Sequence, residues 1–308
     1  ITVTNTASLS DATTLNGFTT GKVTLSSVQD TFSNILSIDS IDSNDVSMGA
    51  AAITVTDAVS FFEATGINGF TTGQITLQKV EDTVSNITSI DAIDSNEVSM
   101  GAAAITVTNT ASLSDATTLN GFTTGKVTLV SVMDTVSNIT SIDAIDSNDV
   151  SMGAAAITVS DAASLTDATA INDFTTGKVT LSSVEDTYSN IQSIKSIPDA
   201  QVDMGAAVVK VSDNVTKTEV DDLRTDTTGN ITLTSLTEDK GDLATINGFS
   251  DVILSTANIT VTDNVDKSEA DTIDAYSNTS GTVTLTSITD TVANVTAVEN
   301  NANISLDT

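Results

Sequence analysis

The chain has 308 residues, with 41 acidic and 10 basic side chains and a formal net charge of −31 at pH 7. This charge argues against a nucleic-acid partner, because almost no basic surface is left to neutralise phosphates. The sequence contains no His and no Cys. That excludes a Ser-His-Asp triad, a thiol nucleophile and the usual zinc sites, and we predict that the chain is not an enzyme.

An internal period of 52 residues runs through the chain. The word V/I-T-L begins at Val23, Ile75, Val127, Val179, Ile231 and Val283, and residues 1–25 are identical to residues 105–129. A period of this size indicates stacked structural repeats. We predict one continuous solenoid over 1–308, with repeats 1–52, 53–104, 105–156, 157–208, 209–258 and 259–308. Because Ile1 stands in the middle of a repeat phrase, we expect the chain to be a piece of a longer array.

The first half of each repeat begins with a predicted strand, such as Ile1-Thr-Val3, in which apolar and polar residues alternate. A predicted helix follows, because Leu9, Ala12, Leu15 and Phe18 are spaced three apart and would share one apolar side. We expect Asn16-Gly17 to end this helix.

The second half begins with a strand at Val23 and continues into another helix. Asp30-Thr31 forms a good N-terminal cap for this helix. The apolar positions of the helical segment are Val28, Phe32, Ile35, Ile38 and Ile41.

The words VSMGAAAITV occur three times, at 46–55, 98–107 and 150–159. We interpret 46–48 as a short strand, 49–52 as a tight turn of small residues and 53–55 as the next strand. At least one of the three alanine methyl groups should face inward. The resulting fold class is a parallel β-solenoid with short helices on one side, an α/β coil stacked like leucine-rich repeats. It has about twelve coils in its six 52-residue repeats.

Two regular polar features accompany the coils. Asn34, Asn86, Asn138 and Asn190 recur in the phrase D-T-x-S-N-I, and two of these positions are N-glycosylation sequons. We favour hydrogen bonds from these amides to the backbone. Pairs of threonines such as Thr2 and Thr4 would form rows on the strands, similar to the arrays of ice-binding solenoids or simply good strand residues.

An acidic loop before each VSM word is the candidate metal site. Carboxylate and amide oxygens in a surface loop suit a hard cation such as calcium, and turn formation is the other explanation for them. The candidate ligands are Asp39, Asp42, Asn44, Asp45, Asp91, Asp94, Asn96, Asp143, Asp146 and Asn148, with Glu97 and Asp149 in the same loops. In the fourth repeat Lys195, Pro198 and Ala200 replace three of these positions.

The phrases V-S-D-A-x-S-L-x-D-A and V-T-L-x-S-V-x-D-T-x-S-N-I resemble the acidic repeats of very long surface proteins of marine bacteria, especially cyanobacteria. This resemblance covers the whole chain. It implies an extracellular or cell-surface location and a structural, adhesive or surface-layer role.

We therefore expect a structural solenoid segment that acts as a rod, adhesin stalk, surface-layer or filament component. The alternative is a ligand-binding solenoid for calcium, a glycan or ice. The expected partners are other copies of the chain or further repeats joined end to end, with a surface glycan as an additional candidate. No apolar run is long enough for a membrane-spanning segment.

Overall fold

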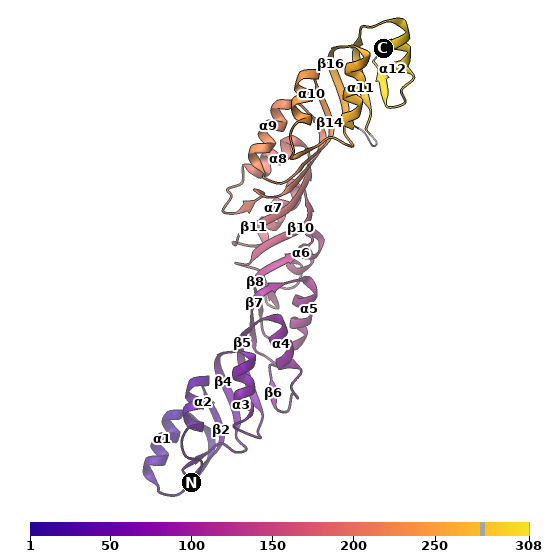
Figure 1. Ribbon diagram of the computed structural model, residues 1–308. Helices are drawn as coiled ribbons and strands as arrows, with labels where there is room; N and C mark the ends of the chain where they lie inside the picture. The colour runs from indigo at the N-terminus through magenta and orange to yellow at the C-terminus, as the bar shows by residue number, and fades with distance from the viewer. Residues whose placement is uncertain (278–280, 308) are drawn as a thin grey trace. The chain divides into compact units, whose positions relative to one another are not determined.

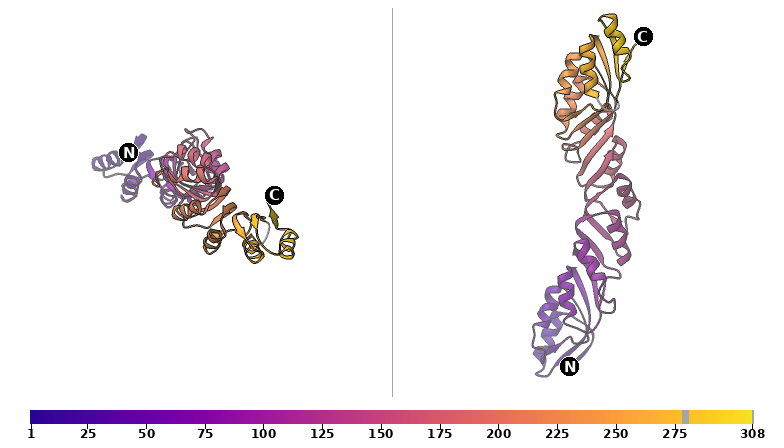
Figure 2. Two further views of the ribbon diagram at one scale, coloured as in Figure 1. Left: turned by 90° about the horizontal axis from the view of Figure 1, so that it is seen from above. Right: turned by 45° about the vertical axis from the view of Figure 1, so that its right-hand side comes forward.

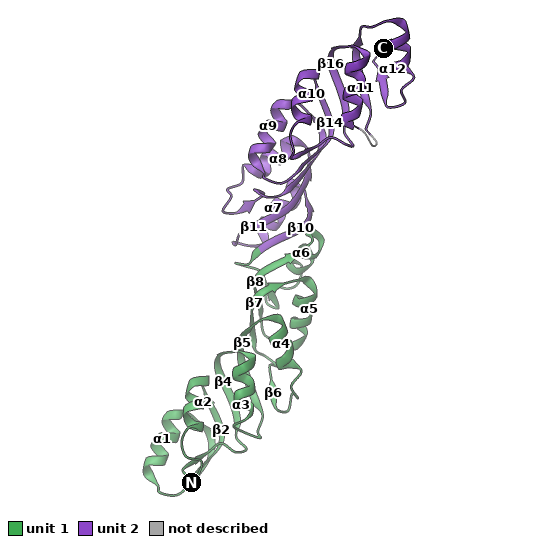
Figure 3. Ribbon diagram, in the orientation of Figure 1, with its two compact units in different colours: residues 1–156 green, residues 157–308 purple. Residues whose placement is uncertain are grey.

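The computed structural model describes residues 1–277 and 281–307 (Figure 1). The chain divides into two compact units, Ile1–Ala156 and Ile157–Thr308 (Figure 3). This division coincides with the predicted boundary between the third and fourth repeats. A single continuous solenoid over 1–308 stays a prediction, and each unit is described by itself.

The first unit alternates strands with short helices. Its strands are β1 (Thr2–Ala7), β2 (Val23–Asp30), β3 (Val46–Ser47), β4 (Ala52–Val59), β5 (Ile75–Asp82), β6 (Val98–Ser99), β7 (Ala104–Ala111), β8 (Val127–Asp134) and β9 (Val150–Ser151). Its helices are α1 (Leu9–Phe18), α2 (Phe32–Asp39), α3 (Phe61–Asn68), α4 (Val84–Asp91), α5 (Leu113–Phe122) and α6 (Val136–Asp143).

The second unit repeats this order. Its strands are β10 (Ala156–Ala163), β11 (Val179–Asp186), β12 (Val202–Asp203), β13 (Val208–Val215), β14 (Ile231–Glu238), β15 (Val252–Ile253), β16 (Asn258–Val265), β17 (Val283–Ile288) and β18 (Ile304–Leu306). Its helices are α7 (Leu165–Phe174), α8 (Tyr188–Lys195), α9 (Lys217–Asp226), α10 (Lys240–Asn247), α11 (Lys267–Asp274), the 3₁₀ turn η1 (Ala275–Ser277) and α12 (Val292–Glu299).

The strands of each unit, over the residues described, pair in parallel. In the first unit β1 pairs with β2, β4 with β5 and β7 with β8, and the second unit pairs β10 with β11, β13 with β14 and β16 with β17 in the same way. Helices follow the long strands and stack in chain order beside them (Figure 2). We call one long strand with its helix a coil. The predicted parallel β-solenoid with short helices is confirmed.

The two strands that flank each GAA turn share one neighbour. Val46 of β3 pairs with Val23 at the start of β2, and Ile53 of β4 pairs with Val28 near its end. The predicted tight turn between them is confirmed, because the Ala51 N–H donates to the carbonyl of Met48 at 2.5 Å. Its middle alanine faces inward: Ala51 is fully buried, whereas Ala50 and Ala52 are exposed.

The core is a ladder of branched aliphatic side chains between the strands and the helices. In the second repeat Ile53, Val55, Ile67, Ile75 and Ile87 are each no more than 1% exposed. Burial of such stripes, contributing about 25 cal/mol per Å² of apolar surface, is the main stabilising term. It requires no aromatic residue, which explains how a chain with 3% aromatic residues folds.

Helix starts are defined by side-chain caps. Thr31 is the N-cap of α2 and accepts from the Asn34 N–H, as predicted. In α1 the N-cap Ser8 and Asp11 form a reciprocal capping box, with the Asp11 carboxylate accepting from the Ser8 N–H at 2.9 Å. Short helices of this kind depend on such caps because their own propensity is too weak to form them.

Three local predictions were wrong. Asn16-Gly17 does not end α1, which continues to Phe18 before the backbone turns extended at Thr19. Val28 belongs to β2 rather than to the helix, and Ile41 lies beyond the end of α2.

Phe18 was also wrongly expected to face the core, since it is 76% exposed. Phe122 stands in an identical 25-residue sequence but is half-buried, because it lines a hollow with Ile90 and Met100 of the preceding coil. The burial of this position therefore depends on the presence of a preceding coil.

Candidate functional site: the acidic loops and the clamps between coils

The acidic loops are exposed turns that follow the second helix of each of the first three repeats. In the first loop the Asp42 carboxylate accepts from the Asn44 N–H and from its side-chain amide, both at 2.9 Å. The Asp45 carbonyl accepts from the Val23 N–H at 2.7 Å and so ties the loop to β2. Asp39 is the last residue of α2.

The second and third loops repeat this geometry. Asp94 accepts twice from Asn96, and Asp146 accepts twice from Asn148. Asp91 and Asp143 end α4 and α6. The structure thus joins one Asp and one Asn of each predicted ligand set in a side-chain turn. Within residues 1–277 and 281–307, no three Asp, Glu, His or Cys side chains gather as a group that could hold a metal ion.

Desolvation distinguishes the helix-terminal aspartates. Neighbouring atoms partly shield the carboxylates of Asp39 and Asp91 from water, and this raises their pKa above the ordinary value. A raised pKa marks a carboxylate whose lost hydration no hydrogen-bond donor replaces. The ionised forms of Asp39 and Asp91 therefore destabilise the folded chain slightly.

Other residues of these loops hold neighbouring segments together. Asn68, at the end of α3, donates to the Glu97 carboxylate at 3.2 Å. At the corresponding positions of the fifth repeat, Arg224 pairs with Asp251 at 2.8 Å, and its guanidinium lies 3.7 Å from the centre of the Phe249 ring. Glu97 and Asp251 therefore stabilise the contact between their loop and the end of the helix in the preceding coil.

A second, more regular set of polar side chains joins successive coils. The Oδ2 atom of Asp82, the last residue of β5, accepts from the backbone N–H of Phe61, the first residue of α3, at 2.9 Å. The first N–H groups of a helix have no partner within the helix, and a carboxylate there also interacts favourably with the helix dipole. We call this bond, from the first N–H of a helix to a side chain of the following coil, a clamp.

Clamps from the second coil of a repeat to the first recur in every repeat. The acceptors are Asp30, Asp82, Asp134, Asp186, Glu238 and Asp290, and the donors are the N–H groups of Leu9, Phe61, Leu113, Leu165, Lys217 and Lys267. The sequence analysis identified Asp30 only as a helix cap. The spacing of 52 residues between these acidic acceptors was the signal that could have indicated a wider role.

The regular asparagines position these acceptors. The Asn86 side-chain amide donates to Asp82 Oδ1 at 2.8 Å, and the Thr83 N–H donates to the same oxygen. The prediction that these amides bond to the backbone was therefore wrong. The amide donates instead to the aspartate four residues earlier. Asp82 accepts three hydrogen bonds and joins two coils.

Clamps also run from the first coil of a repeat back to the helix before it. Within the units, the acceptors are Asp57, Asn109, Asp213 and Asp263, and the donors are the N–H groups of Phe32, Val84, Tyr188 and Lys240. The sequence analysis missed these acceptors. They stand directly after the strand words I-T-V-T and V-K-V-S, at the 52-residue spacing until the sixth repeat.

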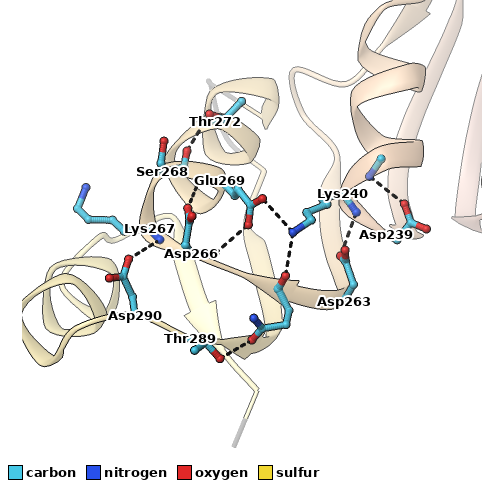
Figure 4. A network of polar contacts seen from close by, with 12 residues as sticks. Asp239, Lys240, Asp263, Asp266, Lys267, Ser268, Glu269, Thr272, Thr289 and Asp290 are labelled. Atoms are coloured by element: carbon cyan, nitrogen blue, oxygen red, sulfur yellow. Dashed lines mark hydrogen bonds and ion pairs between the residues drawn. The ribbon is translucent and has the colours of Figure 1, made fainter.

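Figure 4 shows two successive clamps, from Lys240 to Asp263 and from Lys267 to Asp290. Here the Lys240 side chain adds an ion pair with Glu269 at 2.9 Å. A shallow cavity of about 320 Å³ borders this pair and is lined also by Ser268, Thr272 and Tyr276. This ion pair departs from the pattern of the earlier repeats, in which the first residue of the corresponding helix is uncharged, as Phe32 and Val84 are.

The clamps change the acidity of their carboxylates. For Asp82 and Asp186, partial burial would raise the pKa, but three hydrogen bonds outweigh it and hold the pKa below the ordinary value. The donors for Asp186 are the Leu165 N–H, the Asn190 amide and the Thr187 N–H. The ionised form is thus the one that the fold stabilises.

The threonine rows are present but interrupted. Thr54 pairs with Thr76 and Thr106 with Thr128 across neighbouring strands. The same rows also bring Gln29 beside Thr54 and Glu81 beside Thr106. Long and charged side chains therefore alternate with the threonines.

None of the helices in the described parts of the chain is long and apolar enough to cross a membrane. Comparison with known proteins gave no matching family, no matching curated protein and no matching solved structure.

Proposed function

We propose that this chain is a structural solenoid segment of an extracellular or cell-surface protein, serving as a rod, adhesin stalk, surface-layer or filament component. The observation that supports this proposal is the clamp at Asp30, Asp82, Asp134, Asp186, Glu238 and Asp290, which repeats at the period of the fold. An active site needs a singular arrangement of groups, whereas a clamp in every repeat serves cohesion along the stack.

The expected partners follow from the same stacking. A coil presents one face to the coil before it and the other to the coil after it, so further repeats or other copies can continue the array end to end. The large negative charge suits a solvated surface that resists unspecific association.

Stretching single molecules between their two ends tests the structural role. We expect the chain to resist extension and to unfold in successive steps of whole repeats, about 180 Å each for 52 residues at roughly 3.5 Å per residue. A chain that lengthens smoothly under thermal-scale force, without steps, would show that the coils do not carry tension.

The second candidate is calcium binding in the acidic loops of the first three repeats. Asp42, Asp94 and Asp146 lie in exposed turns of equal geometry, and like charges repeated along a stack favour a bound cation. Against this stands the absence of a three-acid cluster in the described residues.

Thermal melting with and without calcium tests this candidate. Calcium should raise the melting temperature of the full chain, and a variant with Asp42, Asp94 and Asp146 changed to Ala should lose that response. Magnesium at the same ionic strength is the control for screening. An equal response of both proteins to calcium would leave these aspartates as turn residues.

A surface glycan or ice remains an alternative ligand. The cavity beside Tyr276 is the feature that a sugar ring would fit, since it combines an aromatic side chain with the hydroxyls of Ser268 and Thr272. Binding of a glycan panel to the full chain and to Tyr276→Ala would test it. Ice binding is tested by the shape of ice crystals grown in the protein solution.

A further inference from the structure

The face of the first coil leaves core positions uncovered. Val3 of β1 and Leu15 of α1 are partly exposed, whereas their counterparts Val107 and Leu119 are fully buried. A hollow of about 190 Å³ on this face is lined by Val3, Asn5 and Leu15 among others. Asn5 occupies the clamp position of its coil, and the one side-chain hydrogen bond described for it is a long one, 3.4 Å, from its amide to the Thr6 carbonyl.

The face of the last coil is uncovered in the complementary way. Ile288 of β17 and Val295 of α12 are partly exposed, whereas Val80 and Ile87, at the same positions of β5 and α4, are at most 1% exposed. Val292, the first residue of α12, is 84% exposed. Its N–H has no clamp among the residues described.

The chain contains its own example of how two such faces fit. Residues 105–129, identical to 1–25, lie on the coil formed by β5 and α4. There Val80 pairs with Ile105 and Asp82 with Val107, and the Val84 N–H donates to Asn109 at 2.9 Å. The same sequence at 1–25 therefore carries every group needed to form this interface.

The last coil carries the matching acceptor surface. The triplet Asp82-Thr-Val84, which receives β7, is repeated as Asp290-Thr-Val292, and apolar residues occupy 288 and 295 as they occupy 80 and 87. β18 pairs with β17 only as far as Leu285, so the second half of β17, up to Ile288, has no following strand in the described part of the chain.

We propose that a second copy of this chain docks its first coil on the last coil of the first copy. Ile1 of one copy lies beside Ile288 of the other, and Val3 beside Asp290. The Val292 N–H donates to the Asn5 side chain, as the Val84 N–H does to Asn109. This proposal rests on the structural role proposed above and adds its contact residues.

The interface is heterologous, because the two copies contribute different faces. Each added copy leaves one face of each kind free, so association continues into open filaments rather than stopping at a dimer. A net charge of −31 on every copy opposes association at low ionic strength. Salt should therefore favour it by screening this repulsion.

Sedimentation velocity of the full chain, from micromolar to near-millimolar concentration in high salt, tests the proposal. We expect a concentration-dependent series of oligomers. Val3→Asp and Ile288→Asp each remove one face and should give monomers, whereas Thr4→Asp, an equal change of charge on the exposed side of β1, should still assemble. A strictly monomeric wild-type chain overturns the proposal.

Mixing the two single-face variants provides the sharper result. Each retains the face that the other lacks, so an equal mixture should form dimers and nothing larger. Dimers in either variant alone, or none in the mixture, would contradict a heterologous contact between these faces.

Asn5→Ala guards against a folding defect, because Asn5 is exposed and the change removes only the clamp acceptor. It should weaken assembly at least several-fold while leaving the circular dichroism spectrum and the melting curve unchanged. The stretching experiment that tests the structural role is done on single molecules, so its result does not depend on association. A chain that unfolds in repeat-sized steps but stays monomeric would therefore overturn only the present proposal.

Discussion

The carboxylate of Asp186 accepts a hydrogen bond at 2.9 Å from the backbone N–H of Leu165, a residue 21 positions earlier. This bond joins the end of β11 to the start of α7. The same aspartate also accepts from the Asn190 amide at 2.8 Å. One side chain thus terminates a strand, supports the next helix and ties that helix to the one before it.

Removal of this carboxylate should destabilise the chain. Asp186→Ala leaves the Leu165 N–H and the Asn190 amide without their acceptor, and we expect a loss of about 1–3 kcal/mol in the free energy of unfolding. Urea unfolding followed by circular dichroism measures it. Asp173→Ala, at an exposed aspartate of α7, is the matched control and should change stability by less than about 0.5 kcal/mol. Equal effects of the two changes would deny the clamp a special contribution.

The same clamp should make stability depend on pH in the acid range. The pKa of Asp186 is lowered in the folded chain, while an aspartate in an unfolded chain titrates near about 3.9. The stability contributed by its ionised form is therefore complete above the unfolded pKa and is lost as the pH falls through the lowered folded pKa.

Comparison of wild type with Asp186→Asn isolates this contribution from the general decrease in charge repulsion. The difference in unfolding free energy between the two proteins should be constant from neutral pH to about pH 5 and should shrink toward about pH 2. A difference that grows on acidification would mean that the folded pKa is raised rather than lowered.

Replacement of Gly121 and of Gly125 by alanine should change the stability of the chain in opposite directions. A Cβ atom on Gly125 would lie 2.3 Å from the Ala103 carbonyl oxygen, so Gly125→Ala must push two backbone segments apart. We expect a loss of about 1–3 kcal/mol. A Cβ on Gly121, within α5, meets no atom within 4 Å. Gly121→Ala should raise stability by up to about 1 kcal/mol, because alanine is the better helix former. Thermal melts of both variants test this, and the same sign for both would be incompatible with the packing described.

The tandem alanines offer a test of the GAA turn. Ala103 is fully buried, whereas Ala102 next to it is exposed. Ala103→Leu should overpack the turn and cost about 1–3 kcal/mol, and Ala102→Leu should be nearly neutral. Denaturant melts compare the two. Tolerance of leucine at Ala103 would show that the turn is looser than its burial indicates.

The sequence by itself determined the repeat, the strands and the class of fold. Because each coil can bury its apolar stripe only against its neighbours, the 52-residue period predicts stacked repeats. Alternation predicts the strands and three- and four-residue spacing predicts the helices, although the same spacing wrongly added Val28 of β2 and Ile41, beyond α2, to the predicted helix. Even the inward methyl group of the GAA turn followed from the small size that the turn requires.

The tertiary structure alone decided which side chains meet across coils. Asp57 and Phe32 are 25 residues apart, and local patterns say nothing about such a pair. Phe18 and Phe122 share one 25-residue sequence, yet only Phe122 is half-buried, because a preceding coil covers it. Burial and hydrogen bonding between coils depend on what lies next in the stack, and that information is held by the neighbouring coil rather than by the residue itself.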